Sequence, residues 1–354
     1  MTEGAPDLLT AWEGLPFAYG RPPIAAAVRQ QPEDFRVMED LGVAPDGAGE
    51  HIWVHVRKTG WNTADVGQWL ARALGRSPRD VTWAGLKDRH AVAEQWFGVH
   101  RPGGGGIPEL PTPPEGIAIL ATQRHGRKLR TGMLQGNRFR LTLREVEGPL
   151  EELGGRLLRI AHRGVPNYFG GQRFGHGGGN LSGAWRLLDG MPVRNRQRRG
   201  LFLSAARAFM FNQVLAARVR PGLWDAVIAG DLMTFTSSAS LFPAAELAPG
   251  DARVPAADVH PSGPLPGRGG WQPEADAGAL EAETLAPWQA QQQALARLGV
   301  DAARRALRLP VRELAWDWPA HGVLRIGFWL PAGAFATAVL RECCTQRERA
   351  LSNT

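Results

Sequence analysis

The sequence predicts an α+β fold in which a mixed, largely antiparallel sheet is interrupted by an inserted domain. Strand-like alternation of apolar and polar residues occurs within residues 51–144 and returns only within residues 314–330, so both parts should share one sheet. At 354 residues the chain exceeds the usual size of a single core, which favours two domains. We place one domain at residues 1–162 with 312–354, and the inserted domain at residues 163–311.

A strand, a helix and a second strand are expected in succession in the N-terminal part of the chain. Residues 51–58 alternate as in a half-buried strand. Apolar residues then recur at helical spacing in a helix that Asn62 or Thr63 should cap at its N-terminus and that Gly75 should terminate. The chain returns to a strand in the segment VTWAGLKD, which places Asp88 just past a strand end.

Further strands and two long helices follow from the same periodicities. The additional strands are expected at residues 95–100, 117–122, 138–144, 314–318 and 324–330. The two helices are expected at residues 204–219 and 288–309, around a stretch rich in Pro, Gly and Ala at residues 244–270. This helical middle part is the reason for predicting an insertion.

The charge balance of the chain is consistent with a polyanionic partner. The formal net charge is +7 and the sequence pI is about 10.3, and phosphate neutralisation favours such a surplus of cations. Nearly all of the positive charge is arginine, since the only lysines are Lys58, Lys87 and Lys128. A GC-rich genome would also produce that bias, so charge alone leaves a nucleic-acid partner open.

The cysteines and the N-terminal segment point to the cytoplasm. The only cysteines are the sequence neighbours Cys343 and Cys344, which cannot form the disulfide framework of a small secreted protein. The N-terminal segment MTEGAPDLLTAWEG is acidic and contains proline, unlike a signal peptide, and no uninterrupted apolar span of about 20 residues is present. We therefore expect a cytoplasmic protein that does not associate with a membrane.

Nucleotide cofactors and metals are not expected. The glycine runs at residues 103–106 and 175–180 lack the Lys and Ser/Thr ending of a P-loop and the spacing of a dinucleotide motif. His51 and His55 lie on an expected strand, where four residues separate Cα atoms by about 13 Å, too far to share one ion without further ligands. The histidines also form no zinc deaminase signature.

Asp88 is the candidate catalytic residue. It lies in the segment GLKDR, where cations flank it on both sides. Nearby positive charge keeps a carboxylate ionised, and an ionised carboxylate can act as a nucleophile. From these residues alone, a turn aspartate in surface ion pairs is the favoured interpretation, and the nucleophile is the alternative.

Five segments, in the same order along the chain, resemble the motifs of the tRNA pseudouridine synthase D (TruD) family. They are PEDFRVMEDLG at residues 32–42, AGLKDRHAVAEQWF at 84–97, RHGRKLRTGMLQGNRF at 124–139, GVPNYFGGQRFG at 164–175 and FWLPAGAFATAVLRE at 328–342. The similarity runs from about residue 20 to residue 342.

The resemblance implies an isomerase that converts uridine at position 13 of tRNA to pseudouridine. The family fold is a pseudouridine synthase catalytic domain interrupted by an inserted α/β domain specific to the family. The Asp of the family's G-x-K-D motif is the nucleophile and falls on Asp88. The resemblance further implies tRNA as the partner and no cofactor, and we expect a monomer.

The same resemblance assigns residues around the target uridine. Phe35, Asn137, Phe139 and Phe335 occupy the family's uridine-pocket positions, although by pattern alone the phenylalanines would be core residues and Asn137 a turn residue. The family usually carries a lysine six residues before the first of these phenylalanines, where this chain has Arg29. Arg29 and Lys87 are further candidates for substrate contact, and arginine makes a proton-transfer role at position 29 doubtful.

Two other functions remain open from the sequence. One is an RNA-binding or RNA-chaperone protein that keeps the family cleft without catalysis, against which the intact GLKD, GNRF and PAGAF segments argue. The other is a glycosidase-like enzyme in which Asp88 pairs with Glu94 or Glu33, but sequence spacing cannot place those carboxylates.

Overall fold

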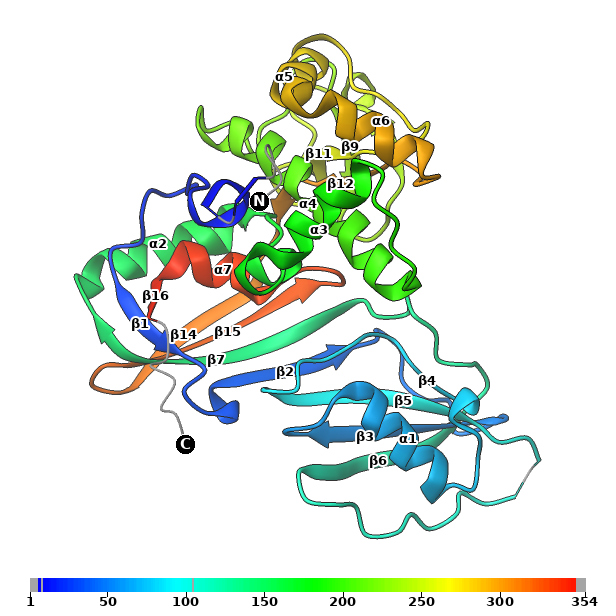
Figure 1. Ribbon diagram of the computed structural model, residues 1–354. Coiled ribbons are helices and arrows are strands. Elements are labelled where there is room, and N and C mark those ends of the chain that lie inside the picture. The colour runs from blue at the N-terminus through cyan, green and yellow to red at the C-terminus, as the bar shows by residue number, and fades with distance from the viewer. Residues whose placement is uncertain (1–5, 8, 104, 348–354) are drawn as a thin grey trace. The chain divides into compact units, whose positions relative to one another are not determined.

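The computed structural model describes residues 6–7, 9–103 and 105–347. The chain divides into two compact units (Figure 1). Unit 1 comprises Met1–Pro22, Glu152–Val311 and Ala334–Cys343, and unit 2 comprises Pro23–Glu151, Arg312–Gly333 and Cys344–Thr354. The domain division at residues 163 and 311 remains a prediction, because compact units defined by contacts need not coincide with domains.

Unit 2 is built on one mixed sheet in which ten strands are described. Its main path runs β14-β15-β7-β2-β5-β3-β6, with β1, β16 and β4 paired at its sides. The strands are β1 (Ala25–Val28), β2 (Phe35–Asp40), β3 (His51–Lys58), β4 (Val81–Trp83), β5 (Val92–His100), β6 (Ile117–His125), β7 (Gly136–Glu147), β14 (Arg312–Ala320), β15 (Val323–Pro331) and β16 (Thr345–Arg347). The pairs β2/β5 and β1/β16 are parallel and the other pairs are antiparallel. A mixed, largely antiparallel sheet that uses both parts of the chain is therefore confirmed (Figure 1).

The alternation of β7 shows why the sequence pattern identified this sheet. Phe139, Leu141 and Leu143 are buried, whereas Arg138 and Arg140 between them are exposed. Side chains of a strand alternate between its two faces, so one face of β7 is apolar and the other is basic. The strand is longer than the predicted segment 138–144 at both ends.

The helix predicted after β3 is confirmed as α1 (Thr63–Ala73). Asn62 occupies the N-cap position, and Gly75 beyond the C-terminus has a φ of 60°, a left-handed conformation that glycine adopts without strain. Val66 and Leu70 of α1 pack against buried residues of β3 and β5 in one apolar cluster. The helix therefore covers the sheet face that carries the apolar residues of β3.

Unit 1 is mainly helical. Its helices are α2 (Leu150–Arg163, which begins just before the unit), α3 (Gly179–Leu188), α4 (Arg196–Val219), α5 (Ala275–Leu285), α6 (Gln289–Arg297) and α7 (Ala336–Cys343). Its strands are β8 (Val165–Pro166), β9 (Leu232–Phe235), β10 (Leu241–Pro243), β11 (Val259–Leu265), β12 (Ala303–Ala306) and β13 (Arg308–Leu309), which form a small four-stranded sheet and one two-stranded pair.

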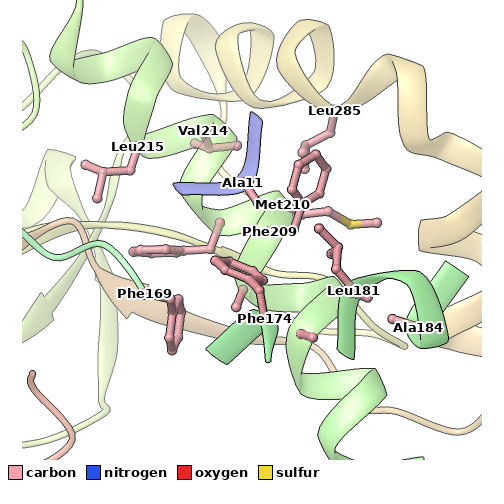
Figure 2. Close-up of a cluster of buried hydrophobic side chains, with 14 of the residues drawn as sticks. Ala11, Phe169, Phe174, Leu181, Ala184, Phe209, Met210, Val214, Leu215 and Leu285 are labelled. Atoms are coloured by element: carbon pink, nitrogen blue, oxygen red, sulfur yellow. The ribbon is translucent and has the colours of Figure 1, made fainter. Parts of the chain in front are cut away.

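Helix α4 forms the centre of the core of unit 1. Phe209, Met210 and Val214 of α4 belong to one cluster with Phe174 and Leu181 (Figure 2). Within the described part of the chain, α4 is the one helix long and apolar enough to cross a membrane, yet 61% of its most apolar window is buried inside the structure. That burial identifies α4 as a core helix.

The prediction of one helix over residues 288–309 is wrong. Helix α6 ends at Arg297, and Gly299 follows with a left-handed φ of 76°. The chain then forms β12, which pairs antiparallel with β11. Pairing with a distant strand overrides the local helical pattern here. The other predicted helix, at residues 204–219, begins earlier in the structure, at Arg196, where the Asn195 side chain accepts a hydrogen bond from the Arg198 N–H at 2.9 Å.

Candidate active site

Asp88 lies in the loop that connects β4 and β5, as expected for a residue past a strand end. Its carboxylate is held at both oxygens: Oδ1 accepts a hydrogen bond from the His90 N–H at 3.0 Å, and Oδ2 accepts one from Arg29 Nη1 at 2.8 Å. The Asp88 side chain is 33% exposed. Asp88 is therefore both oriented and accessible to a substrate.

The buried side chain of Lys58 holds the backbone of this loop. The Lys58 ammonium donates hydrogen bonds to the carbonyl oxygens of Trp61 at 2.8 Å, Asp88 at 2.7 Å and Lys87 at 3.4 Å. Lys58 is fully buried, and this burial lowers its pKa to about 8, although the Asp88 charge acts in the opposite direction. Three peptide carbonyls around Asp88 thus converge on one buried cation.

A second set of buried hydrogen bonds holds the backbone of the same loop at Gly85 and Lys87. Thr63 Oγ1 accepts a hydrogen bond from the Lys87 N–H at 3.0 Å and donates one to Gln95 Oε1 at 2.9 Å. Gln95 Nε2 in turn donates to the Gly85 carbonyl at 3.4 Å. Thr63 and Gln95 are both buried, so the GLKD segment is fixed by polar groups that are shielded from water.

The Lys87 side chain points to Glu39 and not to the Asp88 carboxylate. Lys87 Nζ lies 2.6 Å from Glu39 Oε1, and Glu39 Oε2 accepts the Trp96 N–H at 2.9 Å. Burial raises the pKa of Glu39, while Lys87 opposes that shift. Of the two flanking cations, Lys87 pairs with Glu39 and Arg89 Nε donates to the Gly60 carbonyl at 2.9 Å. The described ion pair of Asp88 is instead with Arg29.

Arg29 lies between the catalytic candidate and an aromatic ring. Its guanidinium carbon is 3.9 Å from the centroid of the Phe35 ring, while Nη1 contacts Asp88. The backbone φ of Arg29 is 59°, a left-handed conformation that is rare for a residue with a side chain. A planar guanidinium can stack on the ring and pair with the carboxylate at once, which a lysine ammonium cannot do in the same way.

The remaining pocket candidates of unit 2 lie on one face of the sheet. Phe35 and Phe139 are 5% and 7% exposed, and their ring centroids are 6.0 Å apart in an edge-to-face arrangement. Asn137, on the same face of β7 as Phe139, is 8% exposed. Among the described residues, Asn137 Oδ1 is buried and has no hydrogen-bond partner. A buried acceptor without a donor is costly, so Asn137 is suited to receive a donor from a ligand.

Phe335, the last pocket candidate, belongs to unit 1. It is partly buried at the edge of the unit 1 core. Its ring lies 6.4 Å from the Phe169 ring, and the Arg173 guanidinium is 5.9 Å from its centroid. The phenylalanine of the PAGAF segment is therefore part of a cationic and aromatic cluster.

The buried residues that hold the loop were not identified from the sequence. The motifs did not supply these residues as candidates; they are Lys58, Thr63, Gln95 and Glu39. For Lys58 a signal was present: it continues the period-two row of Ile52, Val54 and Val56, which the alternation places on the buried face of the strand. A lysine in an apolar row is an unusual residue that requires a polar partner.

Comparison with known proteins gives a consistent result over most of the chain. The family model described as tRNA pseudouridine synthase D (TruD) matches residues 14–181 and 190–343. The tRNA pseudouridine synthase D of Methylococcus capsulatus is 46% identical over 341 residues, covering 96% of each chain, and that of Aeromonas hydrophila is 44% identical over 338 residues, covering 95% of each. A crystal structure described as a TruD protein from Methanosarcina mazei has a TM-score of 0.67 at 19% identity, covering 96% of this chain and 98% of that one, which supports the fold.

Proposed function

Since this chain belongs to the tRNA pseudouridine synthase D (TruD) family, we propose that it isomerises uridine at position 13 of tRNA to pseudouridine, with Asp88 as the nucleophile. The observation that carries the proposal is the Asp88 carboxylate, which Arg29 and the His90 N–H orient while its side chain stays 33% exposed. The buried residues Lys58, Thr63 and Gln95, which bind the loop backbone, fix the position of Asp88 before the substrate binds.

The reaction requires a carboxylate next to the sugar and the base. The bond between uracil N1 and ribose C1′ breaks, the base rotates, and C5 forms a new bond to C1′ while the C5 proton is lost and N1 gains one. Atoms balance without an external reactant. A carboxylate nucleophile can form a covalent intermediate after the first bond breaks and before the second bond forms, and Arg29 orients the Asp88 carboxylate through the 2.8 Å ion pair.

The target base must leave the helical stack, and unit 2 offers it a polar contact. An extruded base is read by hydrogen bonds to its Watson–Crick edge and by stacking. We propose that Asn137 Oδ1 accepts the N3–H of uracil, which is supported by its burial without a donor. Phe35 and Phe139 are largely buried, so we propose that they shape the pocket wall with their edges.

Asn137→Ala is expected to slow modification with little loss of stability. The substitution removes an acceptor that has no partner in the described structure, so folding loses no hydrogen bond, whereas the substrate would lose one worth about 1 kcal/mol, or severalfold or more in rate. Single-turnover rates and thermal unfolding midpoints measure the two effects. Thr142→Ala on the opposite face of β7 is the control, and an unchanged rate in Asn137→Ala would remove Asn137 from the pocket.

The partner in this proposal is tRNA. We further propose that the enzyme acts as a cytoplasmic monomer, without a cofactor, a metal or a membrane. The net charge of +7 supports an RNA partner, and the chemistry above uses only a carboxylate. Light scattering during size-exclusion chromatography would test the monomer.

The proposed function is tested with tRNA that carries tritium at uracil C5. Formation of the new carbon-carbon bond should release tritium to water, and mapping of pseudouridine along the product should place it at position 13. Transcripts with cytidine at position 13 serve as the control and should release no label from that site. Absence of release from unmodified tRNA would contradict the enzymatic function and favour an RNA-binding protein without catalysis.

A further inference from the structure

A cationic and aromatic cluster in unit 1 has no role in the chemistry described above. Arg173 lies in a short 3-10 turn (Gly171–Phe174), and Arg305 lies in β12. Both guanidinium groups face the same ring: their central carbons are 5.4 Å and 4.4 Å from the centroid of Phe169. Arg173 is also 5.9 Å from the centroid of Phe335.

The charge of Arg173 is not neutralised within the described chain. Its Nη1 donates to Ser204 Oγ at 3.0 Å, and no described carboxylate forms an ion pair with it. Burial lowers the pKa of Arg173. Burial also lowers the pKa of Arg305 to about 10, with a contribution from the nearby positive charge of Arg173. Two guanidinium groups thus share one partly buried region, where their like charges repel each other.

Other buried arginines of the same unit show what a purely structural role looks like. Arg218 forms a buried ion pair with Asp231 at 2.9 Å. Arg304, the neighbour of Arg305, pairs with Glu281. Arg308 instead donates to the backbone carbonyls of Arg163, Val254 and His162. Buried guanidinium groups are normally satisfied in one of these two ways, whereas the described hydrogen bond of the Arg173 guanidinium is the one to the Ser204 hydroxyl.

We propose that Arg173, with Arg305 beside it, binds a backbone phosphate of the tRNA substrate, an inference that rests on the proposed function. A phosphate would supply the negative charge that the cluster lacks at Arg173, and a guanidinium fork matches its oxygens. The Phe169 and Phe335 rings, which are tilted by 53° to each other, lie 5.4 Å and 5.9 Å from the Arg173 guanidinium carbon and stabilise a cation there.

The test compares Arg173→Gln with Arg198→Gln. Arg198 is exposed, belongs to the same unit and also stacks on a phenylalanine, at 5.4 Å from the centroid of Phe202. We expect Arg173→Gln to weaken binding of unmodified tRNA roughly tenfold or more, and to reduce the slope of log affinity against log salt by about 0.7 to 0.9. Arg198→Gln should leave both quantities near the wild-type values. Equal affinity and slope for folded Arg173→Gln and wild type would overturn the proposal.

A second measurement places neutral methylphosphonates along the tRNA backbone, one position at a time. At the position that contacts Arg173, the affinity and the salt slope of the wild type should fall, whereas those of folded Arg173→Gln should not fall further. Full affinity of the wild type for every modified tRNA contradicts the proposal, whether or not the variant folds. The proposal is also wrong if every position that weakens the wild type weakens folded Arg173→Gln equally. Tritium release from unmodified tRNA reports separately on the proposed function.

Discussion

Asp88→Asn is expected to abolish pseudouridine formation while folding and tRNA binding stay close to normal. An amide has nearly the size of a carboxylate but is neutral and a far weaker nucleophile, so the rate should fall by on the order of 10⁴ or more. The Asn side chain can still accept the His90 N–H that now binds Oδ1. The substitution also removes the ion pair with Arg29. Because the Arg29 and Asp88 side chains are 27% and 33% exposed, this loss should lower the free energy of unfolding by at most about 1 kcal/mol.

The measurement is tritium release and tRNA binding side by side for the wild type and Asp88→Asn. Glu94→Gln is the matched control, because Glu94 is a nearby carboxylate that pairs with Arg57 at 3.0 Å. It should retain most of the activity. Substantial release by Asp88→Asn would remove Asp88 from the mechanism, and loss of release in Glu94→Gln as well would show that Asp88 is not the only carboxylate the reaction needs.

Lys58→Met is expected to lower both the stability of unit 2 and the turnover rate, with a smaller effect on tRNA affinity. The substitution leaves the carbonyls of Trp61, Lys87 and Asp88 without their shared donor in a buried site. Each unsatisfied buried group costs about 1–3 kcal/mol, so the free energy of unfolding should fall by about 3 kcal/mol or more. A loosened loop places the nucleophile less often in the reactive position, which lowers kcat more than it raises KM.

The pH dependence separates this positioning role from a general loss of stability. The pKa of Lys58 is lowered to about 8 in the folded protein, whereas an unfolded lysine titrates near 10.4. Between these values the unfolded chain binds more protons, so this group makes stability rise with pH there. Turnover should instead decline as pH rises through about 8, because the neutral amine has one hydrogen fewer to donate.

Lys128→Met is the control for Lys58→Met, since Lys128 is an exposed lysine of the same unit. It should change neither the unfolding midpoint nor kcat. If folded Lys58→Met kept the wild-type kcat and the wild-type decline above pH 8, Lys58 would have no part in positioning Asp88.

Local patterns were sufficient where one element depends on its own residues. The alternation of β7 and the helical spacing of α1 predicted both elements, because side-chain period reflects which face meets the core. The same reasoning was wrong for residues 288–309, where β12 forms by pairing with β11, some 40 residues earlier in the chain. A local pattern carries no information about a partner strand at that distance.

The sequence by itself determined the family, the α+β sheet and Asp88 as the candidate nucleophile, because motifs and periodicities are properties of neighbouring residues. The tertiary structure decided which groups act on Asp88. Arg29, which is 59 residues away in sequence, pairs with the Asp88 carboxylate, and Lys58, 30 residues away, donates to the Asp88 backbone carbonyl. Lys87 is adjacent to Asp88 in sequence, but its side chain pairs with Glu39. These contacts depend on the register of β2, β3 and β5 in the sheet, which brings distant side chains together only once the strands have paired.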